Sequence, residues 1–405
     1  MTQHAWEEFS NRRVDRHELV RRHNQELVLS TFLTGGEYTR VQVADMTSLS
    51  KPTVNAIVED LLHSGLVEKV GSRVGVAGRS AAVYRPDPRG GSVVAIDIGA
   101  RKIRGAVANL VGEIVFERTV DTPRRGRLVD EASSLIADLA SNSGAYPNSP
   151  SLAVVGSPGV VDPMTGLLSH ALNTPELIGL PLGQRLQERT GMPVLVENDV
   201  NLATVGEYHH GRAQGLENFA FLWVGNGLGL GAVVGGELLR GSRGAAGEIG
   251  FLALGDKAAG EPNKRGALEA KAGAAGIQAS ARRMRAAFPA TALGQRPSVE
   301  QIFAAAEQRD PLGLAVIDQE ARLLARAAIA VCAILDPALV VLGGGVGANE
   351  LLLDPVQRHM RSLSPLQVNI CASHLRERAA LLGAISVGLA DLHRRVVSDG
   401  ILATG

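Results

Sequence analysis

Two stretches of the chain repeat one pattern, in which an apolar strand reaches a glycine-containing turn and returns as a second strand. Residues 92–120 read SVVAIDIGARKIRGAVANLVGEIVFERTV, and residues 218–239 read NFAFLWVGNGLGLGAVVGGELL. Around them, strand patterns alternate with helical patterns, as they do in α/β proteins. The repeat predicts two similar α/β lobes with a cleft between them, although two unrelated β-hairpins also resemble each other to some extent.

The length of the chain, 405 residues, predicts two or three domains, because a single hydrophobic core rarely grows that large. Residues 85–91 (RPDPRGG) hold two prolines and two glycines, which is typical of a linker. We therefore expect a helical N-terminal domain, the head, over residues 1–88 and an α/β domain, the body, over residues 92–405. In the body, lobe 1 should span about 92–205 together with the C-terminal helix, and lobe 2 about 206–375.

The composition restricts the cellular setting. Only two cysteines occur, Cys332 and Cys371, so neither a disulfide framework nor a thiolate metal cluster can be assembled. The N-terminus lacks the apolar core of a signal peptide, and no run of about 18 apolar residues occurs. We expect a cytoplasmic protein without membrane segments. The net charge is zero, so any binding to nucleic acid depends on a local patch.

The head carries the spacing of a helix-turn-helix. Apolar residues at helical intervals predict one helix over residues 24–33 and a second over 39–46, with Thr39 as its N-cap. After a short turn, Ser50 caps a third helix that ends before Gly65. Two helices joined by a tight turn, the second opening with small polar residues, are typical of DNA-reading domains.

The third helix is the predicted recognition helix. Its first turns present Lys51, Thr53 and Asn55 to base edges in the major groove. A strand, a glycine-rich loop and a returning strand follow, and this hairpin is a wing suited to phosphates or a narrow minor groove. The full set of predicted DNA contacts is Arg40, Ser50, Lys51, Thr53, Asn55, Arg73 and Arg79.

The charge of the head leaves an alternative open. Residues 1–89 hold 12 Lys or Arg and 11 Asp or Glu, a net of +1 (12 − 11), which is a weak electrostatic footprint. A winged helix that binds another protein is compatible with this balance. The basic residues are nevertheless clustered, and the capped helices occur together with a wing, which favours DNA binding.

The glycine turns of the body are candidates for nucleotide binding. A carboxylate at a strand end next to a glycine turn can hold Mg²⁺ or a water beside a phosphate. Each glycine cluster alone is weak evidence, and three clusters in this order are stronger. The candidate nucleotide-binding residues are Asp97, Gly99, Gly225, Gly227, Gly343 and Gly344.

Acidic residues of the body are candidates for sugar binding. Asp199 follows a predicted strand and precedes a helix, where it can accept a proton from a sugar hydroxyl, as a kinase base must. Glu248 and Glu269 add two carboxylates, and carboxylates pair well with sugar hydroxyls. For a single Glu, a surface acid or a helix cap is the commoner explanation.

Together these motifs resemble the ROK family (repressors, open reading frames and kinases), in particular its repressor branch with an N-terminal winged helix. The resemblance runs from about residue 20 to residue 395. The matching motifs are residues 97–99 (DIG), 158–162 (PGVVD), Asn173, 193–194 (PV), 197–199 (END), 241–250 (GSRGAAGEIG), 268–269 (LE) and 336–345.

The resemblance implies an actin-like ATPase fold with a sugar in the cleft between its lobes. It further implies that Asp199 is the catalytic base if the chain is a kinase. The sugar contacts that it implies are Asn173, Asn198, Asp199, Glu248 and Glu269.

The chain departs from the family pattern at three positions. Arg101 stands where the first phosphate loop usually has Thr or Ser, and Asn226 stands where the second has Thr. Phe251 replaces the family's zinc-binding His, which also helps to hold the sugar, and no cysteine lies between Phe251 and Glu269. We therefore expect a vestigial nucleotide site with at most weak turnover, although ATP and Mg²⁺ can still bind there. We also expect no zinc, and a mobile loop over residues 255–265.

The leading hypothesis is a transcriptional regulator, most simply a repressor, of carbohydrate genes. It would bind a double-stranded operator as a dimer or tetramer and respond to a sugar or sugar phosphate. An active ATP-dependent sugar kinase with a DNA-binding head is the alternative, favoured by Asp97 and Asp199 and opposed by Arg101 and Asn226. A scaffold with a vestigial sugar pocket is the third hypothesis.

Overall fold

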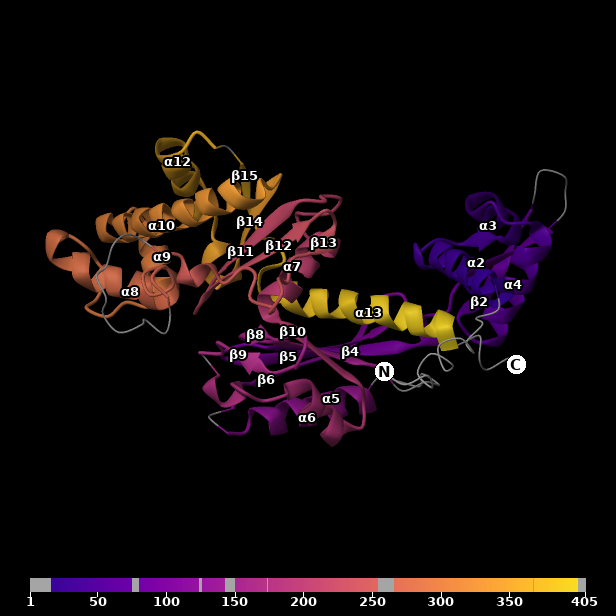
Figure 1. Ribbon diagram of the computed structural model, residues 1–405. Coiled ribbons are helices and arrows are strands. Elements are labelled where there is room, and N and C mark those ends of the chain that lie inside the picture. Colours follow the sequence, from indigo (N-terminus) through magenta and orange to yellow (C-terminus); the bar gives the residue numbers. More distant parts are fainter. Residues whose placement is uncertain are drawn as a thin grey trace, which may run out of the picture.

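The computed structural model describes residues 16–74, 80–123, 126–142, 150–172, 174–253, 266–366 and 368–399. Figure 1 shows a head at one end and two α/β lobes, with helix α13 (Ala379–Asp399) running from the junction of the lobes to the head. This arrangement confirms the predicted fold, a winged helix-turn-helix followed by a two-lobed α/β body. Within the described ranges, no helix is both long and apolar enough to cross a membrane.

Local capping interactions set the helices of the head. Thr39 Oγ1 accepts a hydrogen bond from Gln42 N, and the Gln42 side chain accepts one from Thr39 N, which completes a capping box. Ser50 Oγ accepts a hydrogen bond from Thr53 N at 3.3 Å. Both predicted caps are confirmed. The head consists of α2 (Arg16–Leu33), β1 (Tyr38–Thr39), α3 (Arg40–Thr47), α4 (Lys51–His63), β2 (Val67–Val74) and β3 (Ser80–Pro86).

Two features of the head differ from the sequence prediction. Helix α2 begins at Arg16 rather than at residue 24, because the preceding segment is mostly charged and gives little apolar periodicity. Strand β1 adds a third strand to the wing by pairing Tyr38 with Tyr84, and a two-residue strand is too short to show an alternating pattern. The tip of the wing, residues 75–79, lies outside the described residues.

Lobe 1 is built on a five-stranded sheet with the order β10-β7-β4-β5-β6. The central strand β4 is buried along its whole length, because α5 covers one face of the sheet and α13 the other. The elements of this lobe are β4 (Ser92–Ile98), β5 (Lys102–Asn109), β6 (Ile114–Asp121), α5 (Leu128–Ser141), β7 (Ala153–Ser157), β8 (Val160–Val161), β9 (Leu168–Ser169), α6 (Leu182–Thr190), β10 (Val194–Asn198) and α7 (Asp199–His210).

Lobe 2 is built on a second five-stranded sheet with the order β13-β12-β11-β14-β15. In both sheets an antiparallel meander of three strands is extended by two parallel strands beside its first strand. This shared order confirms that the repeated sequence pattern marks two equivalent halves. The elements are β11 (Phe219–Val224), β12 (Leu228–Val234), β13 (Glu237–Leu238), α8 (Gly273–Met284), α9 (Val299–Glu307), α10 (Pro311–Leu335), β14 (Leu339–Gly343), α11 (Gly344–Gly347), α12 (Leu353–Leu363) and β15 (Asn369–Ala372), with 3-10 turns at Pro88–Gly90 (η1), Pro175–Leu177 (η2), Ile249–Phe251 (η3), Arg285–Ala287 (η4), Glu350–Leu352 (η5) and Arg376–Arg378 (η6).

Helices α7 and α13 are in close contact where the lobes meet, and α7 also contacts strands of both sheets. Glycines allow this approach. A Cβ at Gly206 would come within 2.1 Å of the Ala379 carbonyl oxygen, and one at Gly383 within 1.8 Å of the Leu202 carbonyl oxygen. The backbones of the two helices therefore touch directly, so that a shift of one helix displaces the other.

Residues 85–91 form a compact joint and not the linker that their composition predicts. Asp87 is buried, and its carboxylate accepts hydrogen bonds from the Arg89 backbone and side chain. Gly90 is buried between Gly65 and Leu110, so closely that a Cβ would lie 2.9 Å from atoms of each. Prolines and glycines mark tight turns as well as linkers, which is why composition alone gave the wrong answer here.

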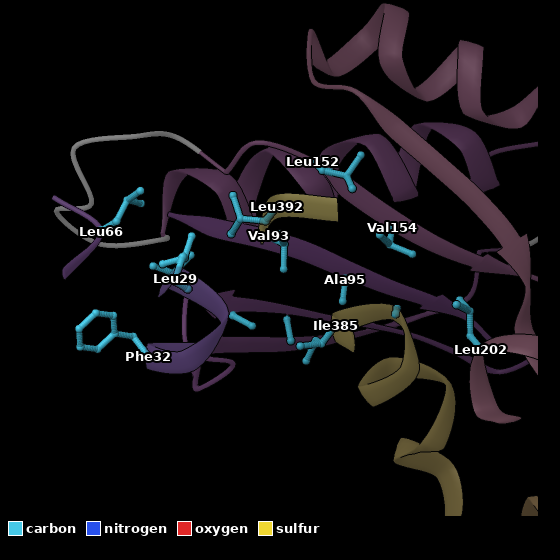
Figure 2. Packing of buried hydrophobic residues seen from close by; sticks show 14 of the residues in the cluster. Leu29, Phe32, Leu66, Val93, Ala95, Leu152, Val154, Leu202, Ile385 and Leu392 are labelled. Atoms are coloured by element: carbon cyan, nitrogen blue, oxygen red, sulfur yellow. The ribbon is translucent and has the colours of Figure 1, made fainter. Parts of the chain in front are cut away.

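The head and lobe 1 share one hydrophobic core. A single cluster of buried side chains includes Leu29 and Phe32 of α2, Val93 of β4 and Leu392 of α13. Figure 2 shows these residues in one continuous layer, with Leu66 of the head close by. We retain 1–88 and 92–405 as proposed domain limits, but the two domains are packed together across a common apolar interface.

Candidate functional site

The first turns of α4 carry the predicted base-reading side chains. Lys51 and Asn55 are exposed and lie four residues apart, hence on one face of the helix. Thr53 is half-buried, and its hydroxyl oxygen lies 2.7 Å from that of Ser50. Among the residues that the structure describes, Lys51 and Asn55 make no side-chain hydrogen bond, so both are available to a ligand.

Two other predicted DNA contacts are engaged within the head. The Arg40 guanidinium donates a hydrogen bond to Glu59 at 2.6 Å and lies 4.9 Å from the ring centroid of Tyr84. Arg73 Nη2 lies 3.7 Å from Glu37 Oε2, and the Arg73 side chain is 57% exposed. Arg40 therefore braces α3 against α4 and the wing in this conformation, whereas Arg73 remains accessible. Arg79 lies outside the described residues.

The ends of three neighbouring strands bring predicted carboxylates of the body together. Gly156 in β7 is in register with Asp97 in β4 on one side and with Glu197 in β10 on the other. Asp199 follows β10 directly as the first residue of α7, and its Cα would lie 3.7 Å from a Cβ on Gly156. Asp97 and Asp199 therefore lie at the same edge of the sheet, where the carboxyl ends of parallel strands meet.

Burial and mutual repulsion alter the pKa values of these carboxyl groups. Burial raises the pKa of Asp97 to about 6, and the Arg104 guanidinium opposes part of this rise. Burial raises the pKa of Asp199 to about 7, with further contributions from the charges of Asp97 and Glu248. Burial also raises the pKa of Glu248, and Glu269 adds to that rise. We call Asp97, Asp199, Glu248 and Glu269, which are linked by these repulsions, the acidic cluster.

Asn198, a predicted sugar contact beside Asp199, is used by the fold. Its Oδ1 accepts a hydrogen bond from Asn201 N at 3.0 Å, as the N-cap of α7, and its Nδ2 donates one to Gly159 O at 2.9 Å. Each of these atoms can still form one further hydrogen bond. Asn173 lies outside the described residues, so its contact with a sugar stays a prediction.

His170 belongs to the site although the sequence analysis did not single it out. Its φ of 56° is uncommon for a residue other than glycine. Its ring lies edge-to-face against Phe251 of lobe 2, with the centroids 5.9 Å apart. Burial raises the pKa of Glu248, and the charge of His170 opposes that rise. A single histidine in a loop gives no spacing signal, and only the contact between the lobes reveals it.

Arg104 is a second residue that the sequence analysis missed. It stands directly opposite Asp97 in the antiparallel β4–β5 hairpin, and directly opposite residues place their side chains on the same face. Arg104 Nη1 lies 3.7 Å from Asp97 Oδ2. Counting the register across the turn at residues 99–101 is a signal that finds this pair from the sequence.

Several glycines of the predicted nucleotide-binding turns are required by packing within the protein itself. A Cβ at Gly343 would come within 2.2 Å of the Phe221 ring, and Gly344 has a φ of +79°. Gly225 N donates a hydrogen bond to Gly227 O at 2.9 Å, which closes the turn between β11 and β12. Close packing alone requires several of these glycines, and the binding of a nucleotide by Asp97, Gly99 and the later turns stays a prediction.

The predicted absence of zinc is likewise still a prediction. Over the described residues, no three His, Cys, Asp or Glu side chains are grouped as metal ligands. Residues 255–265, where a mobile loop was expected, lie outside the described residues. Phe251, at the position of the family's histidine, is 45% exposed and packs against His170.

A cavity of about 730 Å³ opens elsewhere on lobe 1, between α6, β10 and the β8–β9 hairpin. It is lined by Val161, Gln184, Gln187, Glu188 and Val196, among others, and by none of the predicted sugar contacts. The acidic cluster does not line this cavity, although β10 contributes to the cavity wall and leads directly into Asp199.

Comparisons with known proteins agree with this architecture. A protein of Caldicellulosiruptor sp. (strain Rt8B.4), provisionally named xylose repressor, is 25% identical over 391 residues, 93% of this chain and 98% of that protein. The glucokinase of Halalkalibacterium halodurans is 32% identical over 288 residues, 66% of this chain and 85% of that enzyme.

Nearly the whole chain also has a structural counterpart. The crystal structure of a ROK family transcriptional regulator, a homologue of the E. coli Mlc protein, matches 95% of this chain and 99% of its own, with a TM-score of 0.78 and 22% identity. That likeness shows the fold. The family model described as ROK family matches residues 93–390. The chain therefore belongs to the ROK family.

Proposed function

We propose that the protein is a DNA-binding transcriptional regulator, most simply a repressor, of genes for carbohydrate transport or metabolism, controlled by a sugar bound at the acidic cluster. One observation carries this proposal. A winged helix-turn-helix and a ROK body stand in one chain and share a single hydrophobic core. A regulator needs both parts and needs them joined, whereas a kinase needs only the body.

The extent of the similarities supports the same function. The relative with a repressor name aligns with 93% of this chain, which includes part of the head. The glucokinase aligns with 66% of this chain, and the family model begins at residue 93, after the head. The head is thus the part that distinguishes this chain from the kinases to which its body is similar.

The acidic cluster favours an uncharged sugar over a sugar phosphate. Burial raises the pKa values of Asp97, Asp199 and Glu248, and repulsion from neighbouring carboxylates of the cluster adds to the rise for Asp199 and Glu248. A phosphate group would add to this repulsion, whereas hydroxyl groups donate hydrogen bonds to carboxylates. A neutral pentose or hexose fits best, and the names of the relatives make xylose and glucose the first ligands to test.

Helix α13 provides a physical connection between the sugar site and the head. It packs on β4, whose penultimate residue is Asp97, and on α7, which begins at Asp199. Its other end contacts α2, and Figure 1 shows this end beside the head. A ligand that shifts β4 or α7 therefore acts on the head through packed side chains.

The experiment measures ligand binding and operator binding on the full chain. Thermal shift against xylose, glucose and their phosphates identifies the ligand, and operator DNA selected from a random pool is then titrated with and without it. We expect the ligand to change operator affinity by about 5–150-fold, the usual range of coupling. Asp199→Ala and Glu248→Ala should abolish this response and retain DNA binding, while Asp130→Ala, at an exposed position of α5, should change neither. A chain that selects no operator contradicts the proposal.

An active sugar kinase is the second candidate, and two properties of Asp199 favour it: its position directly after β10 and its raised pKa. A carboxyl group with a pKa of about 7 suits a general base. Arg101 and Asn226 oppose it, because each replaces a hydroxyl donor to the phosphates, and loss of one positioned donor costs about 2.7–4 kcal/mol in an oxyanion hole. We expect turnover with ATP and Mg²⁺ far below about 1 s⁻¹. Turnover at that rate in the unmodified protein would establish the kinase.

We also propose that the regulator is a symmetric dimer or tetramer on a repeated operator. One recognition helix reads only a few base pairs, so two heads are needed for useful specificity. Light scattering of the protein with and without its operator measures the number of chains. A single chain on the DNA would contradict this part of the proposal.

A further inference from the structure

We infer that Arg104 and Glu377 are positioning residues that connect the acidic cluster to the start of α13. The pair thereby transmits the presence of the sugar to the DNA-binding head. This inference rests on the proposed function, since it assigns the coupling between the two sites to particular side chains.

Arg104 is placed between two carboxylates that come from distant parts of the chain. Its Nη1 lies 3.7 Å from Asp97 Oδ2, and its Nη2 donates a hydrogen bond to Glu377 Oε2. The Asp97 side chain is 9% exposed and that of Arg104 is 20% exposed, whereas that of Glu377 is 63% exposed. The guanidinium thus extends from a buried acid of the sugar site to an accessible acid at the surface.

Glu377 lies in η6, the turn that leads directly into α13. Arg376, its neighbour, has a φ of 52°, and Arg376 N donates a hydrogen bond to Ser373 Oγ at 3.1 Å. The Ser373 hydroxyl in turn donates to the buried carboxylate of Glu207 on α7. The turn before α13 is therefore held on α7 at one point and on Arg104 at another.

Displacement at this turn reaches the head along the helix. The first residue of α13, Ala379, touches Gly206 of α7, and Gly383 touches Leu202. Near the other end, Leu392 packs against Gly91 at the joint between head and body, with 3.1 Å to the position of a Cβ. Because α13 is one continuous helix packed at both ends, we expect a displacement of its first turn to shift the whole helix.

The charges supply a reason for movement when a sugar binds. Arg104 is shared by Asp97 and Glu377, so a change at one carboxylate alters its attraction to the other. A sugar at the acidic cluster donates hydrogen bonds to carboxylates and displaces water, which changes the charge and solvation that Asp97 presents to Arg104. The position of Glu377, and with it the first turn of α13, then depends on whether the sugar is bound.

A neighbouring ion pair offers a matched control. Arg378 Nη2 donates a hydrogen bond to Glu117 Oε2 at 2.9 Å, which attaches the same turn to β6 without touching the acidic cluster. Glu117→Gln removes an exposed ion pair from the segment just as Glu377→Gln does. A purely structural role of η6 predicts the same effect from both substitutions, whereas the inference predicts an effect on coupling from Glu377→Gln alone.

The test measures four dissociation constants for each full-length variant: sugar alone, operator alone, and each in the presence of the other. The probe is D-xylose or D-glucose, whichever raises the melting temperature of the wild type. For Glu377→Gln we expect both separate affinities within about threefold of wild type, and a coupling factor that falls from the usual 5–150-fold to below about twofold. Arg104→Gln with Glu377→Gln should lose no more coupling than Glu377→Gln alone, because both act through one connection.

Each outcome bears on a different statement. Wild-type coupling in Glu377→Gln, or an equal loss in Glu117→Gln, overturns the inference and leaves the proposed function intact. Loss of sugar binding in Glu377→Gln also overturns it, since Glu377 would then serve the pocket itself. A wild type whose operator affinity responds to neither sugar contradicts the proposed function, and the inference with it.

Discussion

At the scale of single residues, the acidic cluster is the most informative feature, because burial disfavours ionisation of three of its carboxyl groups. In the folded chain Asp199 has a pKa of about 7 instead of 3.8, and Asp97 one of about 6. The folded state therefore binds protons that the unfolded chain releases at lower pH. Carboxyl groups with strongly raised pKa values occur more often at functional sites than in ordinary cores, because binding or catalysis there requires the charge.

Asp199→Asn is expected to stabilise the protein at high pH only. Since its pKa is raised on folding, wild-type stability should fall as pH rises from about 4 to about 7, and the amide removes this loss. At pH 8 we expect a gain of the order of 1 kcal/mol, or about 2–4 °C in Tm. Asp130→Asn, at an exposed ion pair, should show no such dependence. Melting curves at pH 5 and pH 8 measure the Tm shift of each variant. An equal shift of Asp199→Asn at the two pH values would show that the carboxyl group of Asp199 does not have a raised pKa.

The head offers a contrast between a base-reading residue and a bracing one. Asn55→Ala should weaken specific operator binding by about 1–3 kcal/mol, the usual value of a base contact, and leave the melting temperature unchanged. Arg40→Ala removes the contacts with Glu59 and Tyr84, so it should lower the melting temperature of the chain. Operator titration and thermal melting of both variants distinguish the base-reading residue from the bracing one. An Asn55→Ala protein with wild-type specificity shows that α4 is not the recognition helix.

At the scale of elements, the contact between α7 and α13 determines how the lobes are joined. Gly206 and Gly383 permit backbone-to-backbone contact, while Gly388 of α13 faces the Val93 side chain instead. A carbonyl oxygen held in a helix cannot move aside, whereas a valine side chain can adjust by a few tenths of an ångström. Gly383 and Gly388, both in α13, therefore differ in how well their positions tolerate a methyl group.

Gly383→Ala should destabilise the protein more than Gly388→Ala. A Cβ at residue 383 would stand 1.8 Å from a carbonyl oxygen, and one at residue 388 would stand 3.2 Å from Val93 atoms. We expect a cost of about 1–3 kcal/mol or more for the first, typical of overpacking, and a smaller change for the second, offset by the better helix propensity of Ala. Denaturant unfolding gives both values, and the reverse order is incompatible with the close α7–α13 contact.

At the scale of the whole molecule, the head is packed on the body and does not swing on a tether. Leu29 and Phe32 of the head lie in the same cluster of buried side chains as Val93 and Leu392. Elements that share a core lose their packing together, so the head and lobe 1 should unfold in one cooperative step. The same continuity allows a change at the acidic cluster to alter how the head meets DNA.

Leu392→Ala tests this cooperativity. Leu392 is 3% exposed, so the substitution should cost about 2–5 kcal/mol. Hydrogen exchange should show that the free energy of opening falls by similar amounts in α4 of the head and in β4 of lobe 1. Ile334→Ala, at a position that is 80% exposed on α10, serves as the control and should be close to neutral. Increased exchange in only one of the two regions shows that they unfold separately.

The sequence alone determined the features that depend on local chemistry. Thr39 and Ser50 precede helices because their side chains bond the free N–H groups of the first turn, and this is readable within four residues. The repeated strand–turn–strand pattern predicted two equivalent sheets, and both have the same strand order. Asp97 and Asp199 were predicted separately, as a nucleotide-binding and a sugar-binding candidate, because each lies at or just after the end of a predicted strand.

Only the tertiary structure decided the features that depend on distant segments. Residues 85–91 read as a linker, but Gly65 and Leu110 enclose Gly90, and neither is near it in the sequence. The contact of His170 with Phe251 and that of Arg104 with Glu377 join different parts of the chain. Local patterns carry no information on such pairs, because their distance is set by how whole elements pack. The sequence thus predicted the two functional ends of this protein, and only the packing of α13 and the shared core shows how head and body are joined.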